Sequence, residues 1–404
     1  MMGSIMPWLL VALCFALGVA SRSISDTFVM FVPALQQAFD AHRGSVTLIY
    51  SFALLIGGVA APIAGWIVDR FGLRVLTVVG ITATALATVS ASQATALWHL
   101  YLGLGVVMGF GAATLSGVLS ASLLGRWFPS RRLGVALAVA WSASGVGAMA
   151  TFPLAQYLIT TEGWRNAYIV FAAVSAVFIP LLLFLPWARI ERGAPGLQRS
   201  HAAADRGPTV GEAVRDWPFW ALFSSFALTS IGIFSLVPQA MVYLLERGID
   251  GPYAARALAV AGLLTPLGMV GFSWLADRGG RRLAALLAYG STIAGVGALA
   301  LVRGPGDDLW LWLYVLLFGG SMGSRGPMIS TLATLRYRGA HFGRIYGLIT
   351  IGSGVGGFLG AWIGGVLHDL TGNYTAVMIL SVAALVIAAA SLGSEAGARE
   401  RLGR

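Results

Sequence analysis

The chain alternates between long apolar segments and short segments that hold most of its charged residues. An α-helix needs about 20 residues to cross the hydrocarbon layer of a membrane, and twelve apolar segments reach about that length. We therefore predict an all-α membrane protein with twelve transmembrane helices. Their approximate ranges are 7–32, 45–68, 74–93, 97–124, 134–158, 166–186, 217–245, 254–276, 283–302, 309–333, 342–367 and 374–394.

The longest polar interval divides these segments into two groups of six. It runs from Arg189 to Asp216 and is rich in Gly, Pro and Ala, which is typical of a flexible linker. The pattern thus predicts four parts. They are an N-terminal six-helix bundle at 1–188, a cytoplasmic linker at 189–216, a C-terminal six-helix bundle at 217–394 and a cytoplasmic tail at 395–404.

The composition supports insertion in a membrane and excludes several other classes. The chain is 57% hydrophobic and 10% charged, whereas a soluble domain carries about a quarter charged residues. The net charge of +10 comes from arginines in short gaps between apolar segments, not from a basic face, so we expect no nucleic-acid partner. Paired acids, metal-ligand spacings and phosphate-binding loops are absent from the sequence, which predicts no enzyme, no cofactor and no metal.

The arginines also predict the orientation of the helices. Basic residues accumulate in cytoplasmic loops, and nineteen of the 26 fall in segments on one side of the twelve expected helices, together with both termini. Five lie on the other side, and two, Arg22 and Arg325, lie within helices. We therefore expect both termini in the cytoplasm.

A charged sequence pattern occurs once in each half. "GWIVDRFGLR" at 65–74 follows the second expected helix, and "SWLADRGGRR" at 273–282 follows the eighth. Both contain Asp-Arg-x-Gly, and parallel six-helix repeats are a transporter architecture. Glycine at the start of the first copy permits close helix contact, whereas the second copy has Ser273 there, which predicts a looser contact. The predicted gating residues are Gly65, Asp69, Arg70, Gly72, Arg74, Asp277, Arg278, Gly280 and Arg281.

These features resemble the major facilitator superfamily over essentially the whole chain. Three segments are similar to its bacterial members related to monocarboxylate and oxalate/formate transporters: "RRLGVALAVAWSASGVG" at 131–147, "EGWRNAYIV" at 162–170 and "GRIYGLITIGSGVGGFLGAWIGGVLHDLTGNY" at 343–374. The resemblance implies a monomeric secondary transporter of the bacterial inner membrane that works by alternating access. It also implies that Asp69 and Asp277 form cytoplasmic locks that break when the protein opens inward.

Three charges inside the expected helices are the main candidates for function. Arg22 and Asp26 share one helical face. Arg22 falls close to mid-membrane, where a charge costs about 2.5–3.5 kcal/mol, and Asp26 lies nearer the outer end. They form either a self-neutralising ion pair or a site in which Arg22 binds an anionic substrate and Asp26 takes up a proton. Arg325 lies among glycines and serines with no acid nearby in sequence, and it either binds substrate or extends to the cytoplasmic interface.

Three amphipathic side chains are further candidates for substrate binding: Trp141, Gln239 and Tyr346. One feature departs from the monocarboxylate transporters, which carry an arginine in the eighth helix, because 257–276 contains no charge. The leading hypothesis is a transporter of a small organic anion, with proton coupling left open. Two alternatives remain. One is a drug or cation antiporter of the same superfamily, and the other is a membrane receptor that does not transport.

Overall fold

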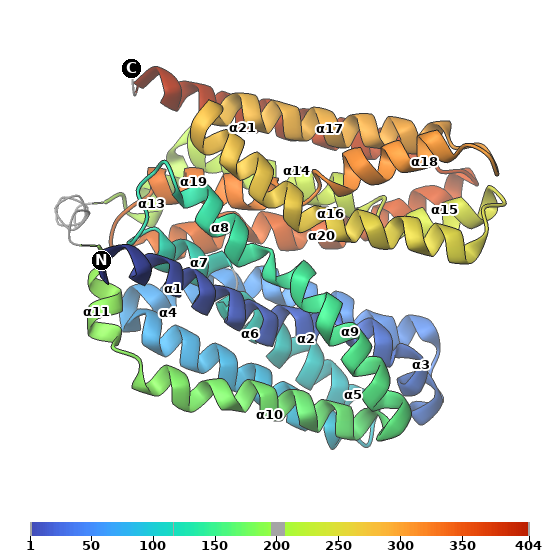
Figure 1. Cartoon of the computed structure of the whole chain (residues 1–404), viewed down its shortest axis with the longest axis horizontal. Helices are drawn as coiled ribbons and strands as arrows, with labels where there is room; N and C mark the ends of the chain where they lie inside the picture. The colour runs from blue at the N-terminus through green and yellow to red at the C-terminus, as the bar shows by residue number, and fades with distance from the viewer. Residues whose placement is uncertain (1, 116, 195–206, 403–404) are drawn as a thin grey trace. The chain divides into compact units, whose positions relative to one another are not determined.

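The computed structural model describes residues 2–115, 117–194 and 207–402, and these residues form helices and connecting turns without a β-strand. The chain divides into two compact units, each containing helices drawn in Figure 1. The first unit comprises Met1–Pro129, Ala140–Val210 and Thr334–Leu348. The second unit comprises Ser130–Val139, Gly211–Ala333 and Ile349–Arg404.

The first unit is built around the long element α4, which packs against α6 and α10. Its described helices are α1 (Met2–Gly18), η1 (Val19–Ser23), α2 (Ile24–Asp26), α3 (Phe28–Phe39), α4 (Arg43–Ser92), α5 (Leu97–Leu100), η2 (Tyr101–Val107), α6 (Met108–Leu115), α7 (Gly117–Leu124), α9 (Ala143–Thr161), α10 (Gly163–Phe184) and α11 (Trp187–Arg192).

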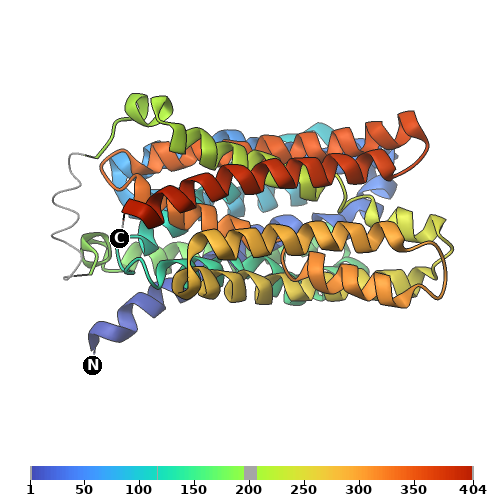
Figure 2. The same ribbon diagram turned by 90° about the horizontal axis from the view of Figure 1, so that it is seen from above.

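In the second unit, α21 runs alongside α14 and α17 (Figure 2). Its described helices are α13 (Val210–Arg215, whose first residue belongs to the first unit), α14 (Trp217–Phe234), α15 (Ala240–Glu246), α16 (Gly251–Gly279), α17 (Arg281–Leu301), α18 (Asp308–Tyr314), η4 (Val315–Gly319) and α21 (Thr375–Leu402). Three helices continue from one unit into the other along the chain: α8 (Leu133–Trp141), α19 (Arg325–Arg336) and α20 (Phe342–Thr371).

Ten of the described helices are long and apolar enough to cross a membrane, and Asp308–Gly319 is a shorter apolar one. The expected second and third spans are continuous as α4, but Gly72 has φ 84° and ψ 178°, so the backbone changes direction there. The expected tenth span is interrupted between Gly319 and Arg325. The long apolar elements therefore match the predicted membrane spans, and the differences lie in where helices join or break.

Each unit has its own aromatic core. In the first unit Phe31 stacks on Tyr168 with ring centroids 4.1 Å apart, and Phe171 lies against the same ring system. In the second unit the buried Tyr243 donates its hydroxyl to the carbonyls of Leu299 and Val302 at 3.2 and 3.0 Å. Such a bond matters because a buried hydroxyl without a partner costs about 1–3 kcal/mol.

A row of glycines on α20 lets this helix approach α14 within the second unit. A Cβ on Gly352 or Gly360 would lie 2.7 Å from a backbone carbonyl oxygen of α14, and Gly356 and Gly364 meet the same helix. Small residues at this spacing allow helices in a membrane to pack backbone against backbone. The glycines at 352, 356 and 360 therefore serve helix packing.

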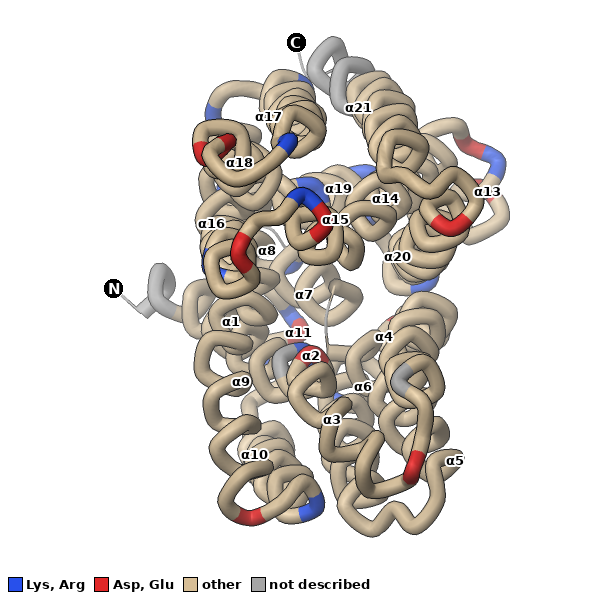
Figure 3. Tube along the Cα trace, turned by 90° about the vertical axis from the view of Figure 1, so that its right-hand side faces the viewer, with Lys and Arg blue, Asp and Glu red and all other residues tan. Residues whose placement is uncertain are grey.

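The outer surfaces of the helices suit a lipid environment. Large apolar side chains remain strongly exposed there, with Phe184 at 89% and Val177 at 69%. Exposure on this scale along apolar helices indicates contact with lipid and not with water. Figure 3 shows charged positions in the loops that join α9 to α10 and α17 to α18, while most of the helical trace is uncharged.

The start of the expected linker folds as α11 and contacts the first unit. Glu191 accepts hydrogen bonds from the backbone N–H groups of Leu73 and Arg74 at 2.7 and 3.3 Å, where α4 resumes after Gly72. Trp127 donates its indole N–H to the carbonyl of Ile190 at 2.8 Å. The linker prediction therefore needs a correction, because residues 187–192 are helical and attached, while 195–206 lie outside the described residues.

We expect Glu191→Ala to lower the thermal midpoint of the purified protein by about 2–4 °C. The carboxylate supplies acceptors to N–H groups that have no partner within their own helix, and loss of such a cap costs about 1 kcal/mol. Arg189→Ala is the matched control because Arg189 is exposed on the same helix. An equal shift in both variants would contradict a capping role.

Candidate functional site

Arg22 lies where the first long helix departs from regular α-helical geometry. Residues Val19–Ser23 form the π-helical segment η1, which connects α1 to α2 and packs against α9. Short π-helical segments occur often at functional sites, because the extra residue displaces side chains from their regular positions. The Arg22 charge that the sequence places inside the first helix therefore lies at a local irregularity of the backbone.

Arg22, Asp26 and Tyr50 form one polar cluster in the first unit. The Arg22 Nε lies 3.4 Å from Asp26 Oδ1, and the Tyr50 hydroxyl donates to the same oxygen at 2.7 Å. The Arg22 and Asp26 side chains remain 38% and 21% exposed, so neither charge is sealed in the protein interior. The predicted i,i+4 pair is present, and the structure adds a tyrosine from α4.

Trp141 and Tyr346 meet beside a single glycine of the first unit. A Cβ on Gly117 would lie 2.8 Å from Trp141 Cζ2 and 3.0 Å from the Tyr346 hydroxyl oxygen. Tyr346 is fully buried and stacks on Phe342 with centroids 5.6 Å apart. The two aromatic candidates are therefore neighbours, although they are 205 positions apart in the sequence.

Gln239 and Arg325 belong to the second unit. Gln239 precedes the first residue of α15 and is half-buried. Arg325 is 1% exposed, and its guanidinium donates to the Ala288 carbonyl at 3.1 Å, to Thr292 Oγ1 at 2.6 Å and to the Met322 carbonyl at 3.1 Å. These contacts direct it toward α17.

A polar network surrounds the interrupted tenth span at this point. Thr292 and Ser321 share a hydrogen bond of 2.6 Å, and the Arg325 Cζ lies 5.2 Å from the centre of the Tyr289 ring. Helix interruptions in membranes need partners for the freed backbone groups, and Arg325 supplies one to the Met322 carbonyl. Arg325 thus has a structural role at the interruption. The two roles predicted from the sequence, substrate binding and extension to the cytoplasmic interface, remain predictions.

The first repeated loop caps a helix from the second half of the chain. Asp69 accepts hydrogen bonds from the backbone N–H groups of Gly343 and Arg344 at 2.8 and 2.9 Å, within the first turn of α20. The Arg344 side chain adds an ion pair at 3.9 Å. A Cβ on Gly65 would overlap the Gly343 backbone, so the glycine allows this contact. All these residues belong to the first unit.

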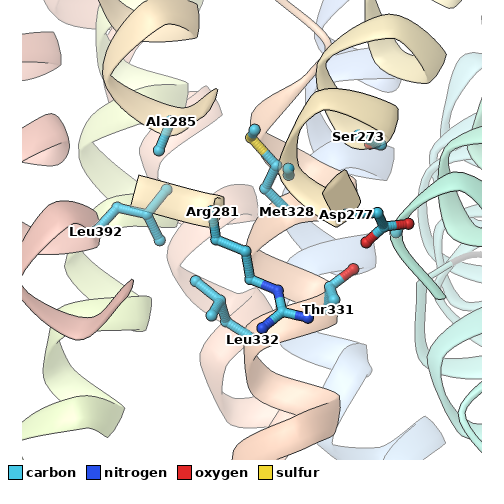
Figure 4. A pocket seen from close by; sticks show the side chains of 10 residues that line it. Ser273, Asp277, Arg281, Ala285, Met328, Thr331, Leu332 and Leu392 are labelled. Carbon is cyan, nitrogen blue, oxygen red and sulfur yellow. The ribbon is translucent and has the colours of Figure 1, made fainter. Parts of the chain in front are cut away.

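The second loop repeats the arrangement within the second unit. Asp277 accepts from the Val135 N–H at 3.0 Å, in the first turn of α8, and Figure 4 shows its carboxylate turned toward that ribbon. Arg281 extends past Thr331 and donates to the Ser130 carbonyl at 3.1 Å. Both aspartates thus bind at helix N-termini, where the helix dipole favours negative charge.

Backbone geometry explains the glycines of the two loops. Gly72 has φ 84° and Gly280 has φ 103°, a region that residues with a Cβ rarely adopt. The arginines of the pattern lie over aromatic rings. The Cζ atom of Arg70 lies 5.6 Å from the centre of the Trp66 ring, and that of Arg278 lies 4.8 Å from the centre of the Trp274 ring. Arg74 donates to the Leu183 carbonyl at 3.3 Å.

Sequence reasoning missed several partners of these residues. Tyr50 carries no local signal, because its contact with Asp26 depends on how two helices pack. Gly134 and Gly343 are the second residues of α8 and α20, and a Cβ on either would meet an aspartate oxygen, at 2.7 and 2.6 Å. Glu191 could have been noticed as an acid among arginines directly after the sixth apolar segment.

Comparison with known proteins agrees with this geometry. The family model of the Major Facilitator Superfamily matches residues 9–361. The chain belongs to the major facilitator superfamily.

Curated relatives of this major facilitator chain include several named as monocarboxylate transporters. It is 29% identical to human monocarboxylate transporter 11 over 93% of this chain and 79% of that protein. It is 30% identical to monocarboxylate transporter 13 of Bos taurus over 94% of this chain and 87% of that protein. An uncharacterized transporter of Bacillus subtilis, YcxA, is 24% identical over 93% of this chain and 92% of its own.

Solved structures share the fold. The proton:xylose symporter XylE matches with a TM-score of 0.79 at 14% identity over 96% of this chain and 95% of that one. The transporter FucP matches with a TM-score of 0.71 at 16% identity over 95% and 98% of the two chains. The major facilitator fold with twelve helices is confirmed. The protein is therefore a multi-pass membrane transporter, and the prediction that it is not an enzyme is also confirmed.

We expect Gly65→Ala to lower the thermal midpoint and the yield of folded protein, because the new methyl group overlaps the Gly343 backbone and separates α4 from α20. Gly290→Ala is the control, since nothing lies within 4 Å of a Cβ there. In a helix that exchange is neutral or favourable by up to about 1 kcal/mol. Equal stability of the two variants would contradict the close contact.

Proposed function

We propose that this transporter carries a small organic anion and that Arg22 binds its charged group. The observation that carries the proposal is the position of Arg22 in a π-helical segment, with its charge partly exposed and only loosely held by Asp26 at 3.4 Å. A carboxylate fits a guanidinium through two parallel hydrogen bonds. The relatives named as monocarboxylate transporters support this substrate class.

Asp26 is the proposed proton-coupling group. While Asp26 is ionised it competes with the substrate for Arg22, and it also accepts a hydrogen bond from the Tyr50 hydroxyl. Protonation of Asp26 weakens its hold on Arg22 and leaves the guanidinium available for an incoming anion. In this scheme one proton and one monoanion cross together, which makes the protein a symporter.

Trp141 and Tyr346 are the proposed apolar and polar walls of the substrate path beside Gly117, and Gln239 and Arg325 are further proposed contacts. Pockets of this kind are mostly apolar with a few placed polar groups. The buried contacts of Arg325 favour a structural role over a substrate contact, so Arg22 is the leading candidate of the two arginines.

The two aspartate caps are the proposed cytoplasmic gate. Opening toward the cytoplasm requires the first turn of α20 to leave Asp69 and the first turn of α8 to leave Asp277. Each departure removes charge-assisted hydrogen bonds, which contribute about 1.5–3 kcal/mol each. We further propose that the protein resides as a monomer in a bacterial inner membrane with both termini in the cytoplasm, as the distribution of arginines predicts.

The alternative function is a drug or cation antiporter of the same superfamily. Few buried acids are available for a cation, and Asp26 is already paired with Arg22 and Tyr50. A thermal-shift screen of the purified protein against monocarboxylates, dicarboxylates, aromatic acids and amines separates the two. Stabilisation by amines alone would overturn the anion proposal.

We expect Arg22→Gln to reduce anion uptake into proteoliposomes by about 10- to 150-fold, the equivalent of losing one charged hydrogen bond of about 1.5–3 kcal/mol. Arg22→Lys keeps the charge but loses the bidentate contact, so it should retain part of the activity. Arg256→Gln is the control for loss of charge, because Arg256 is exposed at the start of α16. Wild-type uptake by Arg22→Gln would refute the assignment.

We expect Asp69→Asn to abolish transport while the protein still folds, because the amide replaces one acceptor oxygen with a donor that faces the N-terminus of α20. Asp307→Asn is the matched control. Asp307 caps the N–H groups of Arg303 and Gly304 at 2.8 and 3.2 Å, outside the repeated loops. Uptake and size-exclusion profiles are measured for both. Normal uptake by Asp69→Asn, or equal loss in both, would contradict a gating role.

A further inference from the structure

A cavity of about 310 Å³ lies beside the first repeated loop, and the proposed transport mechanism uses only Asp69 among the charged residues that line it. All of its lining residues belong to the first unit. Charged and hydroxyl groups are prominent in the lining: Asp69, Ser122, Arg126, Glu191, Arg192 and Arg338. Its volume is in the range of pockets that hold small ligands.

The two carboxylates of this cavity are already bound to backbone N–H groups. Asp69 accepts from the first turn of α20 through both of its oxygens. Glu191 accepts from Leu73 and Arg74, where α4 resumes. The negative charges are thus directed at helix N-termini, and a cation entering the cavity would compete with four hydrogen bonds.

The arginines of the cavity have donors to spare. A guanidinium carries five N–H donors. Among the described residues, Arg126 donates to the Glu191 carbonyl at 3.0 Å and Arg338 donates to the Gly125 carbonyl at 3.5 Å. Burial lowers the pKa of both guanidinium groups from a very high usual value, while Glu191 and Asp69 raise the pKa of Arg126 in part. Arginine at such values keeps its charge.

Two buried polar atoms of the cavity residues have no partner in the described part of the chain. They are Arg338 Nε and Ser122 Oγ. Ser122 is 4% exposed, so water does not readily replace the missing bond. A buried polar group without a partner costs about 1–3 kcal/mol. Both atoms are covered by protein, so a ligand in the cavity would reach the Ser122 hydroxyl after rotation of that side chain, and Arg338 through its outer guanidinium nitrogens.

We propose that this cavity binds a small oxyanion of the phosphate class through Arg126, Arg338 and Ser122. The donors come from three segments, namely α7, the turn that follows it and the turn that precedes α20. A tetrahedral oxyanion presents acceptor oxygens in several directions, whereas a carboxylate presents two in one plane. The source is either a free phosphate or the headgroup of an anionic phospholipid.

Occupancy has a consequence for the neighbouring cap. Arg338 lies four residues before the start of α20 at Phe342, and Asp69 caps the first turn of that helix. An anion bound between Arg126 and Arg338 therefore holds the start of α20 in place next to Asp69. It stabilises the contact whose release we assign to opening, so phosphate should slow transport in addition to binding.

The test uses the full chain purified in detergent, titrated with inorganic phosphate at constant ionic strength against chloride. We expect a saturable rise in the thermal midpoint, and a phosphate Kd by equilibrium dialysis that weakens about tenfold in Arg338→Gln and less in Ser122→Ala. Arg338→Lys should recover part of the affinity. Arg189→Gln removes an exposed arginine of α11 that does not line the cavity, and it should bind like the wild type.

A second arm distinguishes the source of the oxyanion. Nanodiscs of phosphatidylglycerol and of phosphatidylcholine are compared for the wild type and Arg338→Gln. If Arg338 contributes to thermal stability only in the phosphatidylglycerol nanodiscs, the site binds a lipid headgroup. If Arg338 contributes only when free phosphate is added, the site binds a soluble anion. Arg22→Gln should leave phosphate binding intact, which separates this site from the proposed substrate site.

Two results would overturn the proposal. One is phosphate and anionic-lipid binding that Arg338→Gln and Ser122→Ala leave unchanged. The other is loss of phosphate binding in Arg22→Gln, which would place the anion at the substrate site. Neither result depends on whether an organic anion is transported, so the two proposals fail independently.

Discussion

The first N–H groups of a helix have no partner within that helix, and in a membrane protein little water is available to satisfy them. At three places in the described part of this chain, carboxylates from elsewhere in the sequence supply the acceptors. Asp69 binds the first turn of α20, Asp277 binds the first turn of α8, and Glu191 binds α4 where it resumes after Gly72. Charge and helix dipole favour the same contacts. The breaks, loops and attached linker helix of the structure are arranged so that these few acids reach those N–H groups.

Arginine side chains inside the membrane also need hydrogen-bond acceptors, and the two arginines within the expected helices find them in different ways. Arg325 is almost fully buried, and its guanidinium is held by three hydrogen bonds to carbonyl and hydroxyl oxygens of the protein. Arg22 has a carboxylate partner at 3.4 Å and remains partly exposed. A group whose partner can be neutralised by a proton is suited to exchange ligands, whereas a group held by fixed carbonyls is suited to hold helices together. The two arginines thus differ in their partners and exposure, which depth in the membrane alone does not show.

Features that depend on residue spacing along one helix, or on the repeat of the two halves, could be predicted from the sequence. The apolar segments, the duplicated loops and the i,i+4 pair of Arg22 and Asp26 follow from spacing along one helix, and each is present in the structure. Contacts between helices could not be derived in this way. Tyr50 lies 24 residues from Asp26, and Asp69 lies 274 residues from Gly343. The attached helix α11 was missed for a related reason, because a polar and glycine-rich composition describes the interval as a whole and not its first four residues, 189–192, which belong to α11.

The two aspartate caps are related in sequence but unequal in structure. Asp69 uses both oxygens, and Gly65 beside it allows backbone contact with Gly343. In the second copy the glycine is replaced by Ser273, whose buried hydroxyl has no partner among the described residues, and the same is true of Asp277 Oδ1. Unsatisfied buried groups of this kind cost about 1–3 kcal/mol each, so the Asp277 cap is the weaker of the two. The serine that departs from the repeated pattern is therefore the residue that makes the two caps unequal.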